Sequence, residues 1–185
     1  VGGLFRIGSD GRLSRMRIYS SSRLTDTNVC DIAVVGKGNP SSLGREGAVW
    51  AVTVSGVVGI DLAGNAGGNL YPAPVLSGGS DDVYATGADN QTVRIRPSRI
   101  AITQGGDIFI GTQEHGLWKF SSRDGSYHFF ALPGSCVNML SVSANGNLLV
   151  ASDLYGAAEL SPLTGKSLLA YHHPGDPNCV QARFG

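Results

Sequence analysis

The chain has 185 residues with 14 basic and 14 acidic side chains, so its formal net charge at neutral pH is zero. This balance argues against a nucleic-acid-binding surface, for which a basic excess is expected. No apolar stretch approaches the roughly 18 residues needed to cross a bilayer, so we expect no membrane insertion. The 27 glycines, and the even spread of the 42% hydrophobic residues, are typical of an all-β protein.

Three stretches of the chain repeat one pattern of glycine, a turn residue, a run of apolar residues and a hydroxyl. They are Gly47–Thr53, Gly106–Thr112 and Gly146–Ser152, and a second glycine shortly after each opens another apolar strand. The second glycines of the last two stretches, Gly116 and Gly156, are roughly 40 residues apart, which is the length of a four-stranded propeller blade. Self-similarity of this kind predicts an array of small equivalent sheets, and a β-propeller is the architecture that fits best.

In chain order, the pattern predicts a half blade, three four-stranded antiparallel meander blades and the first strand of a further blade. The outer strand of the half blade is expected as one run, Leu13–Tyr19, and short turns such as Arg123–Gly125 contain the glycine that tight hairpins require. An insertion at 36–46 lengthens one turn, and a longer inserted loop occupies 73–97. The expected units are a half blade at 1–20, blades at 29–72, 99–130 and 137–171, and a strand at 180–185.

The second strand of each unit is apolar on both faces, as Ile108 and Ile110 show against Phe109. A sheet that is buried on both sides between stacked neighbours explains this lack of alternation. We therefore expect Trp50, Phe109 and Trp118 to pack in the core rather than to stack on a carbohydrate.

The strand count predicts an incomplete propeller of about four blades, open at both ends. A half blade and a lone terminal strand leave sheet edges that folded proteins normally pair or cover. Three arrangements satisfy this requirement. The chain is a segment of a longer propeller, another chain completes it, or its ends meet in a small four-bladed ring.

The geometry of a meander blade locates a candidate site. The turn between the second and third strands and the connection to the next blade emerge at the same end of each blade, so these loops gather on one face around the axis. Convergent loops are the usual place for a ligand or a partner. The polar residues on these loops are the candidate ligand-binding residues: Arg23, Asp26, Gln113, Glu114, His115, Asp153, Tyr155, His172 and His173.

Catalysis is the alternative interpretation of the same loops. Glu114 and His115 suit an acid/base or metal site, because a carboxylate can orient and charge an imidazole. A single loop histidine is, however, more often solvated, and a third metal ligand is not identified. We therefore assign no catalytic and no metal-binding residue, and we expect no cofactor. A metal-assisted lyase or hydrolase using His115 with Glu114 or His172 stays open as the alternative.

The unit Gly106–Phe120 resembles the two-component-regulator propeller repeat. That repeat has a Gly-x-Ile/Leu-Trp-Ile-Gly-Thr strand followed by Gly-Leu-x-Arg-Phe/Tyr, and this segment ends in Gly-Leu-Trp-Lys-Phe. The likeness is weaker in the third unit, where Ala157 and Ala158 replace leucine and an aromatic residue. Repeats of streptogramin lyase propellers are similar to it.

The resemblance implies a sensor-like or scaffold propeller, often in a periplasmic or extracellular location. We expect a non-enzymatic binding module whose partner is a protein or a small ligand such as a glycan fragment. The remaining blades of the same parent protein are a further expected partner. A structural subunit of a larger assembly, completed by another chain, is the third alternative.

Overall fold

A computed structural model describes residues 4–15, 17–19, 28–44, 46–60, 67–73, 75–76, 93–131, 136–152 and 156–171. The described part of the chain consists of β-strands and one short 3-10 helix, η1 (Ser41–Leu43), and contains no helix of a length and hydropathy that would span a membrane. The strand predicted at 180–185 lies outside the described residues.

Three four-stranded units form the body of the molecule, and in each of them consecutive strands pair antiparallel as a meander. The predicted fold class, an all-β propeller built from such blades, is confirmed. We call these units the first, second and third blades. Their strands are β4 (Val29–Val34), β5 (Val49–Thr53), β6 (Gly56–Ile60) and β7 (Gly67–Pro72); β10 (Pro97–Ile102), β11 (Ile108–Thr112), β12 (Leu117–Phe120) and β13 (Tyr127–Ala131); and β14 (Val137–Val142), β15 (Leu148–Ser152), β16 (Gly156–Leu160) and β17 (Ser167–Tyr171).

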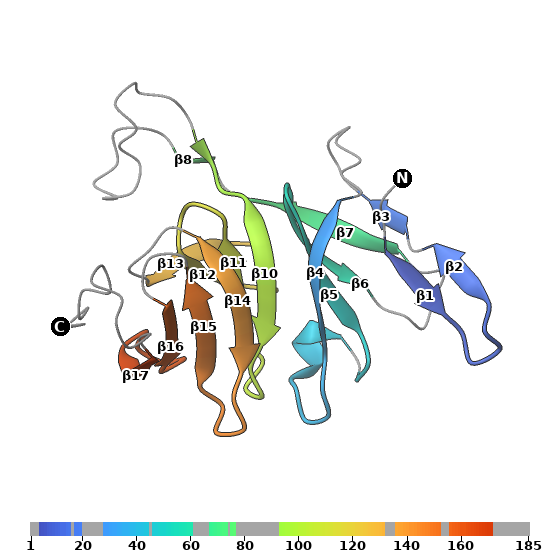
Figure 1. The fold of residues 1–185 in the computed structure, drawn as a ribbon. Coiled ribbons are helices and arrows are strands. Elements are labelled where there is room, and N and C mark those ends of the chain that lie inside the picture. Colours follow the sequence, from blue (N-terminus) through green and yellow to red (C-terminus); the bar gives the residue numbers. More distant parts are fainter. Residues whose placement is uncertain are drawn as a thin grey trace.

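The blades follow one another in a row, with the innermost strands β4, β10 and β14 next to each other (Figure 1). A two-stranded hairpin, β1 (Phe5–Ile7) and β2 (Leu13–Arg15), lies at the end of the row beside the first blade. Within 73–97, β8 (Val75–Leu76) pairs with β9 (Val93–Arg94), and β10 begins at Pro97, two residues before the predicted blade start.

The outer strand expected over Leu13–Tyr19 is divided in the structure. Its second part, β3 (Arg17–Tyr19), leaves the hairpin and pairs in parallel with β7, which makes the sheet of the first blade five-stranded. An edge strand presents a row of unpaired N–H and C=O groups, and β3 satisfies that edge of β7. This pairing between two units cannot be recognised from the repeat, because the repeat describes only one unit at a time.

Each blade packs against the next through apolar side chains. One buried cluster lies between the first and second blades and includes Trp50, Ile110 and Trp118, while a second lies between the second and third blades and includes Phe109 and Leu148. Ile110 and Phe109 are neighbours in β11 and belong to different clusters. The prediction that blades are buried on both faces is therefore confirmed for the second blade, and Trp50, Phe109 and Trp118 are core residues as expected.

A tyrosine hydroxyl joins the first two blades. Tyr127 of β13 accepts a hydrogen bond from the backbone N–H of Val57 at 3.1 Å and donates one to the backbone carbonyl of Tyr71 at 2.8 Å. Its ring packs edge-on against Phe120. Burial raises the pKa of Tyr127 above its ordinary value of 10.0. The hydroxyl thus links β13, the outer strand of the second blade, to the backbone of β6 and β7 in the first blade.

Candidate functional site

In the first and second blades, the turn between the second and third strands lies at the same end as an inter-blade connection. The backbone N–H of Gln113, in the β11–β12 turn, donates to the carbonyl of Arg96 in the connection before β10, at 3.0 Å. In the first blade, the N–H of Ala73, which follows β7, donates to the carbonyl of Ser55 in the β5–β6 turn at 2.8 Å. We call this end of the described blades the rim.

The backbone of the β11–β12 turn is hydrogen-bonded to buried side chains, and the turn exposes two polar side chains. The N–H of His115 donates to the hydroxyl of Thr112 at 2.9 Å, and the indole N–H of Trp118 donates to the carbonyl of His115 at 2.7 Å. Both partners are buried. Gln113 and Glu114 are exposed above them. The turn therefore exposes an amide and a carboxylate, and hydrogen bonds to buried side chains hold its backbone in place.

His115 departs from the expectation that a loop histidine is solvated. Only 7% of its surface is exposed, and its Nδ1 atom is buried with no hydrogen-bond partner among the described residues. The bonds to Thr112 and Trp118 hold the backbone of the turn on both sides of this buried ring. Burial lowers the pKa of His115 from 6.5, and the nearby charge of Glu114 partly opposes this shift.

The structure describes three of the nine predicted site residues. Gln113, Glu114 and His115 lie on one turn, as the sequence requires, and the first two are accessible. The other six predicted residues lie outside the described residues: Arg23, Asp26, Asp153, Tyr155, His172 and His173. Their position relative to the turn stays a prediction. Among the residues that the structure does describe, no group of three or more His, Cys, Asp or Glu side chains could hold a metal ion.

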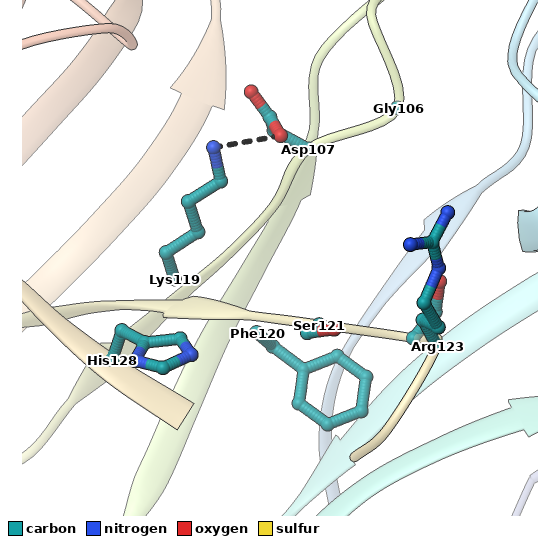
Figure 2. A pocket seen from close by; sticks show the side chains of 8 residues that line it. Gly106, Asp107, Lys119, Phe120, Ser121, Arg123 and His128 are labelled. Atoms are coloured by element: carbon teal, nitrogen blue, oxygen red, sulfur yellow. Dashed lines mark ion pairs between the residues drawn. The ribbon is translucent and has the colours of Figure 1, made fainter. Parts of the chain in front are cut away.

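A pocket that the sequence analysis missed lies at the opposite end of the second blade. It has a volume of about 260 Å³ and is lined by the β10–β11 turn, β12 and the β12–β13 turn. Figure 2 shows the ammonium of Lys119 directed at Asp107, with which it forms an ion pair of 2.8 Å. His128 lies opposite Lys119 on the neighbouring strand β13. His128 Nε2 lies 3.0 Å from the hydroxyl of Ser126. Nothing in the glycine-delimited repeat indicated this pocket, because the repeat describes strands and turns one unit at a time.

The third blade replaces the charged pair of this pocket by another polar pair. At the positions of Lys119 and Asp107 it has Glu159 and Asn147, and Asn147 Nδ2 donates to Glu159 Oε1 at 2.8 Å. The equivalent of Arg123 is Leu163, in the corresponding turn. Both blades therefore have a polar contact at this position. The residue on the third strand is the cation Lys119 in the second blade and the anion Glu159 in the third blade.

Comparison with solved structures identifies the fold. The extracellular domain of a protein from B. thetaiotaomicron, described as a one-component system, matches 97% of this chain and 21% of its own, with a TM-score of 0.62 and 14% identity. The extracellular domain of a hybrid two-component system from the same organism matches 85% of this chain and 19% of its own, with a TM-score of 0.57 and 19% identity.

A third similar structure is a catalytically inactive virginiamycin B lyase from Staphylococcus aureus with quinupristin. It matches 94% of this chain and 49% of its own, with a TM-score of 0.57 and 12% identity. No protein-family model and no curated protein matches the chain. At these identities the likeness concerns the fold, and the expected resemblance to two-component-system and streptogramin-lyase propellers is confirmed at that level. The chain spans about a fifth of the first two solved domains and half of the third.

Proposed function

We propose that this chain is a non-enzymatic binding segment of a sensor-like β-propeller and takes its ligand at the rim. One observation carries the proposal: Gln113 and Glu114 are exposed on a turn whose backbone is fixed by Arg96, Thr112 and Trp118. A recognition loop that is ordered before binding loses less conformational entropy when the ligand arrives. We therefore expect such a turn to bind its ligand more tightly than a freely moving loop of the same composition would.

The side chains define the ligand chemistry. Gln113 offers an amide donor and acceptor, Glu114 offers carboxylate acceptors, and the exposed Arg96 lies in the connection that bonds the turn. Mixed donors and acceptors suit a hydroxyl-rich ligand such as a glycan fragment, and they also suit a polar protein surface. The extracellular domains with the same fold support a periplasmic or extracellular location for the parent protein.

His115 supports binding over catalysis. A general acid or base must reach within hydrogen-bond distance of the substrate, and this imidazole is 7% exposed beneath the turn. We therefore propose that His115 supports the turn while Gln113 and Glu114 contact the ligand. The lyase or hydrolase alternative would need this side chain at the surface.

The test is titration calorimetry of the purified chain with a panel of soluble oligosaccharides. We expect at least one to bind, and the double variant Gln113→Ala, Glu114→Ala to bind it about tenfold or more weakly, because hydrogen bonds to charged groups contribute about 1.5–3 kcal/mol each. The matched control is Arg123→Ala, which removes an exposed side chain at the opposite end. If both variants lose the same affinity, or if the double variant binds as tightly as the wild type, the site lies elsewhere.

A further inference from the structure

The three innermost strands carry equivalent apolar residues whose exposure differs. In each strand, one residue pairs with the middle of the second strand: Ile32 with Ala51, Ile100 with Ile110, and Leu140 with Val150. Ile100 is 3% exposed and Leu140 is 7% exposed, whereas Ile32 is 47% exposed. The same position is thus buried in the second and third blades and uncovered in the first.

The preceding blade provides the cover in the two buried cases. Ile100 belongs to the cluster against which Ala33 of β4 packs, and Leu140 belongs to the cluster that contains Ala101 of β10. Ala33 and Ala101 are themselves equivalent, since each follows the apolar residue of its own strand by one place. At both junctions, a small residue on one innermost strand therefore contributes to the apolar layer that buries the large residue on the next.

The first blade has this cover only over its outer strands. Leu4, beside the β1–β2 hairpin, packs against Val58, Ile60 and Leu70 of β6 and β7. On β4 the same face is open, and Val34 is 57% exposed together with Ile32. We call Ile32 and Val34 the β4 surface. The hairpin occupies the place of an outer half blade, so the uncovered area corresponds to the inner two strands of that blade.

We propose that the β4 surface binds the inner hairpin of another blade of this repeat, that is, a first and a second strand. This partner continues the stacking that already joins β4 to β10 and β10 to β14. The internal junctions also specify a polar contact. Asp31 Oδ2 accepts a bond from the N–H of Ile100 at 3.1 Å, and Arg99 Nε donates to the carbonyl of Asn138 at 2.6 Å.

The incoming strand is therefore defined chemically. It presents a small residue toward Ile32, and a hydrogen-bonding side chain two residues earlier that reaches the backbone of β4, as Asp31 precedes Ala33 and Arg99 precedes Ala101. Over the outer strands of this face, Leu4 already packs against Val58, Ile60 and Leu70. Pairing of the two apolar faces buries Ile32 and Val34 away from water.

The probe is a fluorescently labelled synthetic peptide of Pro97–Thr112, the inner hairpin of the second blade, whose binding to the chain is measured by anisotropy. We expect saturable binding that Ile32→Glu weakens by at least about tenfold, because docking would bury an unpaired charge. Leu163→Glu, at an outer turn where the side chain is 85% exposed, is the matched control. Thermal melting checks that both variants are folded.

A pair of peptide variants tests the orientation. Ala101→Glu places the charge on the face that would contact β4, and we expect it to abolish binding. Ile100→Glu places the same charge on the other face, and we expect binding to persist. Absence of binding, or equal effects of the two peptide changes, would overturn the proposal. A stable dimer of the chain alone that Ile32→Glu dissociates would also overturn it, because a second copy would then be the occupant.

Discussion

Removal of the Tyr127 hydroxyl tests whether the first two blades are joined as the structure describes. Tyr127→Phe keeps the ring against Phe120 but leaves the N–H of Val57 and the carbonyl of Tyr71 without this partner. Val57 is 0% exposed, so water does not replace the lost acceptor. A buried polar group without a partner costs about 1–3 kcal/mol. We therefore expect the free energy of unfolding to fall by about 2–3 kcal/mol.

Urea denaturation followed by tryptophan fluorescence measures this loss, because Trp50 and Trp118 are both buried. For a chain of this length, about 2 kcal/mol corresponds to a decrease in Tm of about 4–8 °C. Tyr71→Phe is the matched control, since it removes a hydroxyl from a ring of the same aromatic cluster and keeps the backbone carbonyl. We expect its effect to stay within about 0.5 kcal/mol.

Because the pKa of Tyr127 is raised, we also expect a specific loss of stability at alkaline pH. Above pH 10.0 an unfolded tyrosine loses its proton while the folded one keeps it, so this contribution to stability is present below pH 10.0 and decreases as the pH rises further. Tyr127→Phe lacks that decrease. A variant as stable as the wild type, or one indistinguishable from Tyr71→Phe, would refute the bridging role.

Three further changes test the packing, the repeat equivalence and the buried imidazole. Gly111→Ala places its new Cβ 2.5 Å from a side-chain carbon of the third blade and is expected to destabilise by about 1–3 kcal/mol, whereas Gly105→Ala, with 3.9 Å of clearance, is expected to be nearly neutral in the same denaturation assay. Lys119→Glu alone is expected to lose up to about 1 kcal/mol by facing Asp107, and adding Asp107→Asn is expected to restore stability, as in the third blade. If the double variant is no better than the single one, the two polar pairs are not equivalent. Because the folded pKa of His115 lies below 6.5, stability is expected to fall as the pH drops from 6.5, and a melting series should show a smaller fall in His115→Leu.

The candidate site was only partly accessible to sequence reasoning. The glycine-delimited repeat located the β11–β12 turn, and the meander rule placed it beside the inter-blade connection, as the bond from Gln113 to Arg96 confirms. The burial of His115 was not predictable, because side-chain exposure depends on the tertiary packing around the turn and not on the local pattern. The pocket at Lys119 was missed for a similar reason, since three separate segments form its wall.

The sequence by itself determined the architecture of one blade, because strand length, apolar pattern and turn glycines are local properties that recur at Gly47, Gly106 and Gly146. It also indicated burial on both faces through Ile108, Phe109 and Ile110. Only the tertiary structure decided how the units meet: β3 joins the sheet of another unit, and Ile32 is exposed where Ile100 is buried. These outcomes depend on which neighbour is present, and a repeated sequence does not encode the identity of its neighbour.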